Sequence, residues 1–537
     1  MKRPTTAWRL ITRLMTAVVL TASSVLAHTT ECTQQPGFRQ LLHSGWGNGV
    51  ENKRFQVHSD INLSNVRHLQ LEWVFALDDD MSPHSYPVIT EDTVFIGTSV
   101  GNLYALERES GCTRWQFGAG EPIRTGITHG RLGGRDLLFF GTFQGNVFAV
   151  DGVTGQLVWK QDVKDHPYVM VTGTPTYHDG ELFVPISSGE VALAISPFYG
   201  CCKFRGSLVS LDAATGATNW RTHIIREQPK VIGRHFIFVE EWGPSGAPVW
   251  SSPTVDTERG LVYVGTGENY THPATATSDA IIAFYTNTGE IVWTQQYTRG
   301  DAFNMACGLP YFNANCPDDS GPDLDFGAPP VLSITSTGNA ILLAGQKSGG
   351  VYGIDPASGQ RIWETQYGRG GMLGGVHWGM AVNERLGLLF APISDVPTGP
   401  GFTDEADPGL HALDITTGEA RWSAPNSGNC EGREKCRSGL SAAITATDDL
   451  VFASALDGYV HAYDAETGDI VWSYDTWREF DALNGVTARG GSIDVHGPAI
   501  AGKWMYVQSG YGSFGQQGGN VLLAFKVGPV HNGESHE

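Results

Sequence analysis

The sequence predicts an all-β fold, an eight-bladed β-propeller, from three observations. One pattern recurs along the chain: an alternating apolar stretch, a turn of the form Asp-x-x-Thr-Gly, and a second short stretch that ends on Trp. Eight tryptophans end such stretches, spaced 42 to 73 residues apart, which is enough for a four-stranded blade with insertions. Amphipathic helical stretches are nearly absent. The eight are Trp73, Trp115, Trp159, Trp220, Trp293, Trp363, Trp422 and Trp472.

Each copy of the pattern is expected to form a β-hairpin. Alternating apolar residues favour a strand, and the Gly-containing segment between two such stretches favours a turn. The tryptophan that ends each copy is expected to pack between neighbouring blades and to carry no chemistry. The clearest copies are 145–159, 206–220, 349–363, 409–422 and 458–472, and weaker copies are 101–115 and 279–293.

The two ends of the chain are expected to meet and close the ring. Trp73, in LEWVFAL, precedes the first complete copy, and the strand-like segment 518–525 follows the last tryptophan. Pairing these two strands would remove the free edge of the sheet. A functional site is then expected on the central axis, where the blade loops converge, with the longest insertions between Trp159 and Trp363.

The first 27 of the 537 residues are typical of an export signal, with four basic residues before an apolar run that ends in Val25-Leu26-Ala27. We therefore expect residues 1–27 to be a signal peptide and 28–537 to form one propeller domain. No later stretch holds the 18 or so apolar residues of a membrane span. The expectation is a soluble protein of the periplasm with no stable membrane anchor.

The charge balance argues against nucleic acid as a partner. The chain has 56 acidic and 35 basic residues, a net charge of −21, and this field repels nucleic acid and anionic lipid. Simple colloidal solubility is a sufficient reason for such a charge.

All eight cysteines follow the signal, and an even number in an oxidising compartment predicts disulfides. Cys307 and Cys316, and likewise Cys430 and Cys436, are near enough in sequence for local bridges. Those bridges leave two further pairs, Cys32 with Cys112 and the adjacent Cys201 with Cys202, although each adjacent cysteine could instead pair with a distant partner. No C-x-x-C-H sequence is present, so a covalently attached c-type haem is not expected.

The repeat A-x-D-x-x-T-G-x-x-x-W resembles the tryptophan-docking motif of quinoprotein alcohol dehydrogenases, and the resemblance extends over nearly the whole mature chain. Five segments look most like the polyvinyl-alcohol dehydrogenase branch. Members of the family are eight-bladed propellers that hold pyrroloquinoline quinone (PQQ) and calcium on the axis. The resemblance implies oxidation of secondary or bulky alcohols, polymers included, with a separate cytochrome c as electron acceptor. The five segments are 44–56, 201–216, 246–256, 260–270 and 509–525.

PQQ is flat and carries three carboxylates, so its site needs an aromatic floor and cationic and hydroxyl partners. The resemblance implies that Trp250 is this floor, that Arg124 and Thr172 meet the carboxylates, and that Lys347 bonds the reactive quinone oxygens and favours the reduced form electrostatically. Trp378 is expected in the pocket wall or, equally, in the core. The full set of residues expected to bind the cofactor is Trp250, Arg124, Thr172, Cys201, Cys202, Arg205 and Trp378.

The resemblance also supplies a metal site and a base. Glu190 and Asn269 are expected to ligate calcium together with Asp301, which would also take the proton of the alcohol. Taken by position alone, Asp301 in its Gly-rich loop reads as a turn residue, and Asn269 begins a glycosylation sequon. Lanthanide-using relatives carry a second Asp two residues after the base. Phe303 stands at that place here, which favours calcium.

Three further segments complete the expectations. The resemblance implies that Cys201 and Cys202 form a disulfide near the cofactor, with Arg205 either in the site or capping a strand. The acidic loop 316–327 lacks the spaced Glu of a calcium loop and is expected to be a turn-rich lid held by Cys307 and Cys316. The match to G-x-G-x-x-G at 510–515 leads into a strand, so no dinucleotide site is expected there.

A different class of function is compatible with the same repeats. A non-catalytic propeller could serve as a protein-binding scaffold in envelope assembly and use its rim loops to hold partners. Such a scaffold gives no reason for Glu190, Asn269, Asp301 and Lys347 to converge, so the arrangement of acidic and basic side chains near the axis separates the two functions.

Overall fold

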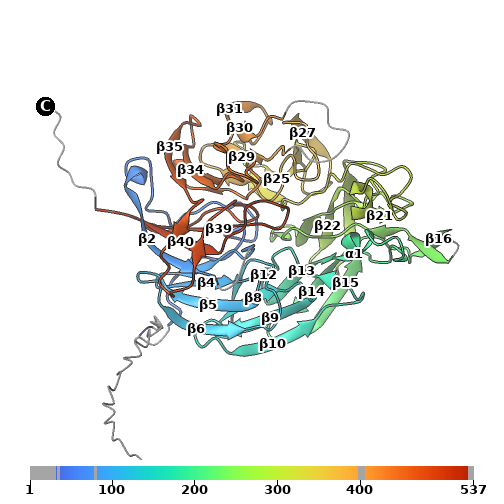
Figure 1. The fold of residues 1–537 in the computed structure, drawn as a ribbon, viewed down its shortest axis with the longest axis horizontal. Coiled ribbons are helices and arrows are strands. Elements are labelled where there is room, and N and C mark those ends of the chain that lie inside the picture. The colour runs from blue at the N-terminus through green and yellow to red at the C-terminus, as the bar shows by residue number, and fades with distance from the viewer. Residues whose placement is uncertain (1–31, 33–36, 78–81, 237, 397–405, 530–537) are drawn as a thin grey trace, which may run out of the picture.

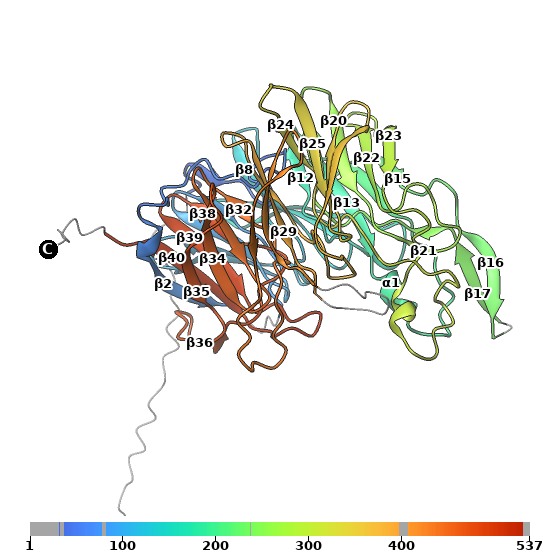
Figure 2. The ribbon, with the colours of Figure 1, turned by 90° about the horizontal axis from the view of Figure 1, so that it is seen from above.

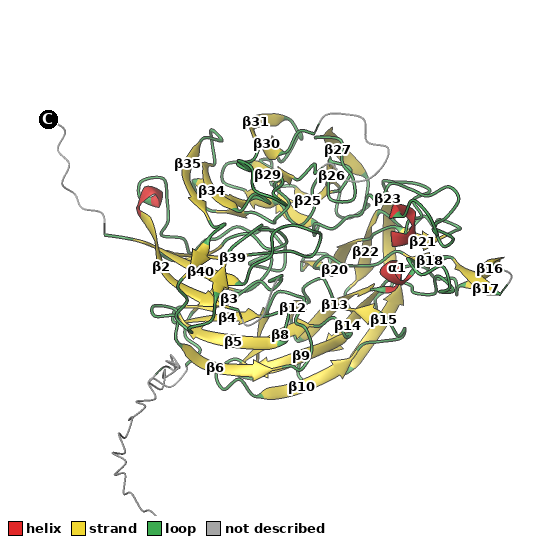
Figure 3. Cartoon of the chain, in the orientation of Figure 1, coloured by secondary structure: helices red, strands yellow, loops and turns green. Residues whose placement is uncertain are grey.

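The computed structural model describes residues 32, 37–77, 82–236, 238–396 and 406–529, and these residues are almost entirely strands and loops (Figure 3). Eight sheets of four or five antiparallel strands stand around a central axis, which confirms the predicted eight-bladed propeller (Figure 1). The expected signal peptide at 1–27 lies outside the described residues. Among the described helices, none is long and apolar enough to cross a membrane.

The first four blades in chain order are each continuous in sequence, apart from added strands at their edges. The first comprises β1 (Leu41–His43), β3 (Val88–Thr90), β4 (Thr93–Gly97), β5 (Asn102–Glu107) and β6 (Thr113–Gly118). The second comprises β7 (Thr128–Leu132), β8 (Arg135–Gly141), β9 (Asn146–Asp151) and β10 (Leu157–Asp162). The third comprises β11 (Val169–Met170), β12 (Thr176–His178), β13 (Glu181–Ser188), β14 (Ser207–Asp212) and β15 (Thr218–His223). The fourth comprises β19 (Thr254–Asp256), β20 (Leu261–Gly265), β22 (Ala280–Tyr285) and β23 (Ile291–Gln296).

Three more regular blades follow. The fifth comprises β24 (Val331–Ile334), β25 (Ala340–Gly345), β26 (Gly350–Ile354) and β27 (Arg361–Gln366). The sixth comprises β28 (Ala381–Asn383), β29 (Leu388–Ile393), β30 (Gly409–Asp414) and β31 (Ala420–Pro425). The seventh comprises β32 (Thr445–Ala446), β33 (Leu450–Ser454), β34 (Tyr459–Asp464) and β35 (Ile470–Asp475).

The eighth blade joins the two ends of the chain. It comprises β38 (Ala499–Ala501), β39 (Trp504–Ser509), β40 (Val521–Val527) and, from the N-terminal part, β2 (Leu69–Ala76). Trp73 of β2 pairs with Ala524 of β40, as the sequence predicts, and Figure 1 shows the two strands side by side. Closure of this kind completes the eighth blade from both ends of the chain, so that only the short edge strands of the blades stay unpaired on one side.

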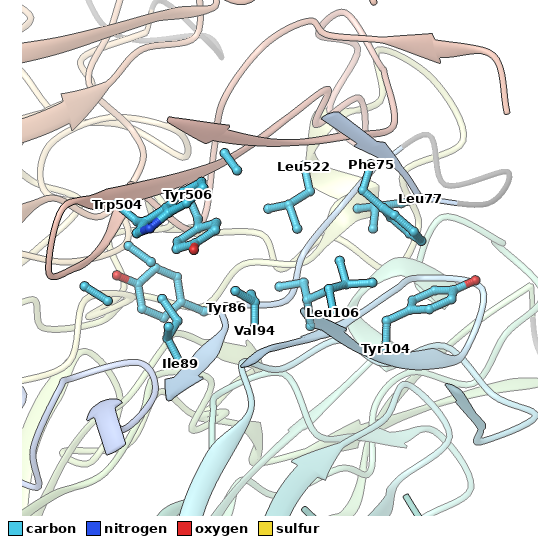
Figure 4. Packing of buried hydrophobic residues seen from close by; sticks show 14 of the residues in the cluster. Phe75, Leu77, Tyr86, Ile89, Val94, Tyr104, Leu106, Trp504, Tyr506 and Leu522 are labelled. Carbon is cyan, nitrogen blue, oxygen red and sulfur yellow. The ribbon is translucent and has the colours of Figure 1, made fainter. Parts of the chain in front are cut away.

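The closing blade packs against the first blade through a buried apolar cluster (Figure 4). Phe75 and Leu522 of the closing blade face Leu106 and Tyr104 of β5, and their side chains are almost completely buried. Burial of this apolar surface holds the ends of the ring together, since the hydrophobic effect scales with the area removed from water.

The repeat tryptophans connect neighbouring blades, as the sequence predicts. Six of them donate a hydrogen bond from Nε1 to a backbone carbonyl of the next blade, at 2.8 to 3.1 Å. The glycine of the next turn lies against the indole ring, with a positive φ that favours glycine. The six are Trp73, Trp159, Trp220, Trp293, Trp363 and Trp422.

Substitution of one such glycine is expected to lower stability strongly. A Cβ on Gly359 would lie 2.5 Å from Cε3 of Trp293, at φ 74°, so Gly359→Ala adds a steric clash to backbone strain. We expect the free energy of unfolding to fall by about 3 kcal/mol. Gly338→Ala is the matched control, because Gly338 has φ 82° with no atom within 4 Å, and it should cost about 1 kcal/mol. Equal losses in urea denaturation would contradict the packing role.

The insertions gather on the side of the ring near the third and fourth blades. They contain α1 (Glu190–Leu193), η2 (Met305–Gly308), the two-stranded sheet of β16 (Lys230–His235) with β17 (Val239–Gly243), and β18 (Ser245–Gly246) paired with β21 (Asn269–Thr271). The β16–β17 hairpin extends away from the body of the ring beside α1 (Figure 2). The remaining small elements are η1 (Val66–His68) and the pair β36 (Glu479–Phe480) with β37 (Ala488–Arg489).

The four predicted cysteine pairs are all formed. Cys32 bonds Cys112, Cys307 bonds Cys316, and Cys430 bonds Cys436, with Cα–Cα distances of 5.4, 4.8 and 5.5 Å. The adjacent Cys201 and Cys202 bond each other rather than distant partners. The first bridge joins the N-terminal segment to the first blade, while the Cys201–Cys202 and Cys307–Cys316 bridges lie within the insertions of the third to fifth blades.

Candidate active site

A cavity of about 250 Å³ opens near the axis, where loops of several blades meet. Its wall includes five of the residues that the sequence singles out, and each comes from a different part of the chain between β6 and β28. The volume approaches the range usual for sites that bind small organic ligands. The five are Arg124, Thr172, Trp250, Lys347 and Trp378.

Three buried carboxyl groups line the same cavity. Glu268, Asp323 and Asp325 each offer an oxygen, and these atoms lie within 4.8 Å of one another. Lys347 Nζ lies 2.9 Å from Asp323 Oδ1 and 2.9 Å from Asp325 Oδ2. One cation against three acidic groups leaves a net deficit of positive charge, which a bound metal ion would supply.

Burial sets the protonation of this cluster. Burial first, and then the charges of Asp325 and Asp323, raise the pKa of Glu268 well above its usual value. Burial also raises the pKa of Asp323 to about 7 against the opposing effect of Lys347. The pKa of Asp325 is lowered, because Lys347 and the neighbouring Glu268 outweigh its burial. Asp325 is therefore the carboxylate of the metal-free protein, and the other two hold protons more readily.

Trp250 is fixed in place by contacts on several sides. Its Nε1 donates to Asp325 Oδ2 at 3.0 Å, Lys347 Nζ lies 5.2 Å from the ring centre, and Trp378 meets it edge to face. A Cβ on Gly327 would lie 2.1 Å from Cη2 of Trp250, so only glycine fits behind the ring. The indole is held rigidly beside the carboxyl cluster.

Arg124 is a buried cation whose guanidinium makes no ion pair or hydrogen bond with the part of the chain that the structure describes. Its Cζ lies 5.2 Å from the ring of Trp378 and 5.9 Å from that of Phe143. Burial lowers the pKa of Arg124. Across the cavity wall, Thr172 Oγ1 lies 2.6 Å from Ser187 Oγ. Ser187 Oγ donates its proton to Met170 O, so a ligand carboxylate would satisfy the Arg124 cation and accept from the Thr172 hydroxyl alone.

His377 also lines the cavity and was not predicted. Ser441 Oγ donates to Asp494 Oδ1 at 2.6 Å, so the single hydroxyl proton is used and His377 Nδ1, at 2.7 Å, donates to Ser441. These two hydrogen bonds fix the tautomer of His377 and leave Nε2 of its ring unprotonated. Burial, together with the charge of Lys347, lowers the pKa of His377 well below its usual value, so the imidazole stays neutral.

Two expected calcium ligands lie away from the cavity wall with their oxygens engaged. Glu190 accepts from Tyr199 Oη at 2.7 Å and from the backbone N–H groups of Lys203 and Phe204. Asn269 donates to Ser245 O and accepts from the backbone N–H of Thr275. Both side chains tie insertions together, and the structure does not bring either one to the carboxyl cluster.

Asp301 lies behind the wall. Its Oδ2 accepts from the backbone N–H of Leu324, between Asp323 and Asp325, while its Oδ1 is buried with no hydrogen-bond partner in the described chain. Burial raises the pKa of Asp301 to about 6. Gly321 packs so closely that a Cβ there would lie 2.0 Å from Asp301 Oδ1. The visible effect of Asp301 is to hold the loop that carries the other two aspartates.

Three of the residues expected to bind cofactor also lie outside the cavity lining. Arg205 donates to the carbonyls of Ile225 and Arg226, which is the strand-capping alternative. Cys201 and Cys202 belong to the same buried cluster as Tyr270, which lines the cavity. The disulfide is buried and does not line the cavity.

The acidic loop 316–327 differs most from its prediction. The sequence predicts a turn-rich lid there, and the Cys307–Cys316 bridge does form. The loop does not simply cover the site, however, because it supplies Asp323 and Asp325 to the carboxyl cluster. The sequence features that could have indicated the carboxyl cluster are the Asp-x-Asp pair of this loop and the Glu that precedes Asn269 in GTGENY.

Comparison with known proteins places the chain in a family. It is 37% identical to a protein named polyvinylalcohol dehydrogenase from Sphingopyxis sp., over 90% of this chain and 76% of that one, and 36% identical, with the same coverage, to one of that name from Pseudomonas sp.. The chain belongs to the PQQ-dependent alcohol dehydrogenases, in the polyvinyl alcohol dehydrogenase branch. The sequence resemblance is thereby confirmed.

Family models and solved structures agree with the fold of this dehydrogenase. Residues 191–310 match the glucose/ethanol/alcohol dehydrogenase β-propeller domain, while 70–231 and 373–510 match a model described as outer membrane protein assembly factor BamB. A europium-containing methanol dehydrogenase superposes with a TM-score of 0.68 at 17% identity, covering 90% of this chain and 98% of that one. The quinohemoprotein alcohol dehydrogenase of Comamonas testosteroni gives 0.65 at 18% identity, covering 94% and 83%.

The residues of the dehydrogenase cavity fit PQQ and a cation. The unpaired guanidinium of Arg124 suits a ligand carboxylate, the rigid face of Trp250 suits a flat ring, and the carboxyl cluster supplies hard oxygen ligands. The same cavity therefore contains the groups that suit the quinone and the carboxyl cluster that suits the cation, with Lys347 between them.

Proposed function

We propose that this chain is a periplasmic PQQ- and metal-dependent dehydrogenase that oxidises secondary or bulky alcohols, polymers included, and passes electrons to a separate cytochrome c. The observation that supports it most is the convergence of Lys347 with three carboxyl groups beside a fixed tryptophan and an unpaired arginine. Relatives named polyvinylalcohol dehydrogenase favour a polymeric substrate. These 537 residues contain no C-x-x-C-H sequence for attaching a c-type haem, which supports a separate cytochrome c as the electron acceptor.

Each residue of the cavity would have its own role in binding the quinone and the cation. Trp250 would support the quinone ring, while Arg124 and the Thr172 hydroxyl would hold its carboxylates. Glu268, Asp323 and Asp325 would hold the cation. When bound, the quinone supplies a two-electron acceptor and the cation polarises its reactive carbonyl. Lys347 would keep the two aspartates fixed and place positive charge beside the oxygens that gain electron density.

We assign the base to Asp323 in place of Asp301. Asp325 is engaged on both oxygens, by the backbone N–H of Glu268 and by Trp250 and Lys347. Asp323 lines the cavity and uses only Oδ1, which leaves Oδ2 to accept the hydroxyl proton of an alcohol. Asp301 is fully buried behind the wall, where an alcohol does not reach it.

The reassignment changes the expectation for the metal. With Asp323 as the base, the residue two places later is Asp325 rather than a phenylalanine, so the sequence argument for calcium no longer applies. Three carboxyl oxygens suit any hard cation, and their combined charge favours a trivalent ion at least as much as Ca²⁺. We therefore propose a hard cation, with Ca²⁺ and La³⁺ compared directly.

Cation binding to the metal-free protein is expected to weaken as the pH falls. Glu268 and Asp323, whose pKa values are raised, hold protons at acidic pH, with that of Asp323 at about 7. Each proton must leave before its oxygen can bind the cation, so affinity is full above these pKa values and lost below them. We expect the Kd for Ca²⁺ to rise roughly tenfold per pH unit for each proton displaced. A Kd that stays constant between about pH 5 and pH 8 would contradict this linkage.

Reconstitution tests the proposed function. The mature chain, made in a host that lacks PQQ, is mixed with PQQ and either Ca²⁺ or La³⁺, and dye reduction is followed with primary alcohols, secondary alcohols and polyvinyl alcohol. Metal-dependent oxidation of secondary alcohols is the expected result. A folded protein that binds no PQQ would instead support the scaffold function, which shares the BamB-type repeat match. Fractionation of the native host then tests export.

A further inference from the structure

The most exposed aromatic side chains of the described chain lie on three neighbouring segments of the insertions. Phe198, Phe238, Tyr311 and Phe312 are exposed by 70 to 78%, and Phe236 by 49%. No other aromatic side chain in the described ranges is as much as 50% exposed. We call these five residues the aromatic crest. Exposed aromatic groups concentrated on one surface are typical of a binding site.

The crest is built from three segments that are bonded to each other. Phe198 follows α1, and its ring centre lies 5.8 Å from that of Phe236, in the β16–β17 hairpin. His235 Nε2 lies 2.9 Å from Pro197 O and joins the same two segments. Figure 2 shows the hairpin extending beside α1.

The third segment is the loop closed by the Cys307–Cys316 bridge, which carries Tyr311 and Phe312. From this loop Asn315 Nδ2 donates to the carbonyls of Ala194, Ser196 and Tyr199, at 2.9 to 3.1 Å. The three segments that carry the crest are therefore held together as one unit.

The adjacent cysteines anchor this unit. The backbone N–H of Trp242 in β17 donates to Cys201 O at 2.8 Å, and the N–H of Cys202 donates to Trp242 O at 3.4 Å. Lys203 Nζ lies over the Trp242 ring at 4.0 Å, while its backbone N–H donates to Glu190. The disulfide and Glu190 together fasten the base of the hairpin to α1.

The insertions that bear the crest also reach the cavity wall. α1 places Val191 in that wall, and η2 places Met305 there, so the same insertions that bear the crest also form the apolar side of the cavity. A long ligand with one group beside the carboxyl cluster would leave the cavity along these segments. The crest residues carry no charge, which suits an uncharged ligand better than a charged partner.

We propose that the aromatic crest is a subsite for a hydroxylated carbon-chain polymer, which it holds while one hydroxyl of the chain occupies the cavity. This inference rests on the proposed function. A chain of alternating CH₂ and CHOH groups presents aliphatic hydrogens that pack on aromatic faces, while its hydroxyls stay in water. None of the crest residues lines the cavity, so a small alcohol held there would not contact them, and the crest would strengthen the binding of a polymer but not of a small alcohol.

Two double variants test the crest: Phe236→Ser with Phe238→Ser, and Tyr311→Ser with Phe312→Ser. We expect kcat/KM for polyvinyl alcohol to fall at least about tenfold through KM, while kcat/KM for 2,4-pentanediol stays within about twofold. Tyr285→Ser is the matched control, because Tyr285 is 44% exposed at the end of β22, away from these insertions. Cys201→Ala with Cys202→Ala should reproduce the polymer defect by loosening the hairpin.

A binding measurement keeps the inference separate from catalysis. Retention of fluorescent polyvinyl alcohol by the protein without PQQ should be lost in both double variants and kept in the control. If the wild-type protein oxidises no alcohol, the proposed function fails. The polymer-binding measurement would still show whether the crest binds polyvinyl alcohol. Unchanged polymer binding and unchanged polymer kcat/KM would overturn the inference. So would a defect confined to electron transfer to a cytochrome c, which would assign the crest to a protein partner.

Discussion

Asp323→Asn is expected to lower turnover of a secondary alcohol about 10³-fold, the loss usual when a general base is removed. Asn keeps an amide oxygen for Lys347 Nζ, now 2.9 Å from Oδ1, but it cannot take a proton from the alcohol. PQQ should still bind, because Trp250 and Arg124 are unchanged. Turnover is measured at saturating metal, and bound PQQ is measured by its absorbance in the same sample.

Asp301→Asn is the matched control, since it makes the same change in a buried aspartate behind the wall. Its amide oxygen can still accept from the Leu324 N–H, so we expect turnover to stay within about tenfold of wild type. If Asp301→Asn abolishes turnover and Asp323→Asn does not, the base is Asp301 and our assignment is refuted.

Lys347→Met is expected to have the second largest effect. It removes the cation that faces Asp323 and Asp325, so turnover should fall about 10²- to 10³-fold. The metal-free variant should also lose about 3 kcal/mol of its free energy of unfolding at alkaline pH, because buried carboxylates are left unpaired.

Bound metal should reverse much of that stability loss, since a cation replaces the missing positive charge. Urea denaturation with and without Ca²⁺ measures the difference, and Lys347→Arg, which keeps the charge, is the control. A stability loss that metal does not reduce would mean that the lysine acts through packing rather than through charge.

The fold was predictable because its information is local and repeated. Each hairpin carries its own alternation, its turn glycine and its tryptophan, and contacts such as Gly359 against Trp293 follow from the repeat itself. The closing pair of β2 with β40 follows from counting blades. The cysteine pairs were predictable for a related reason, since three of the four join residues that are close in sequence.

The site was predictable only in part. Trp250 and Lys347, which the sequence predicts for the site, both line the cavity, and their roles there stay predictions. The register in GTGENY was not predictable, because successive residues of an extended chain point to opposite sides. Glu268 faces the cavity and Asn269 faces Ser245, whereas the sequence favours Asn269.

The remaining site residues could not be predicted because they lie in long insertions. The loop between η2 and β24 spans more than 20 residues, so nothing local shows that Asp323 and Asp325 return to the axis. The Cys307–Cys316 bridge and the contact of Asp301 with Leu324 N–H determine that path, and both are tertiary interactions. The role of Glu190 depends likewise on donors from residues 199 to 204.

The most direct test of the site is crystallographic location of the cation in protein loaded with PQQ and La³⁺, by anomalous scattering. We expect one peak between the carboxyl groups of Glu268, Asp323 and Asp325, with the quinone over Trp250. A peak ligated by Glu190, Asn269 and Asp301, with the cluster around Lys347 left without metal, would contradict the assignment and restore the ligand set that the sequence resemblance implies.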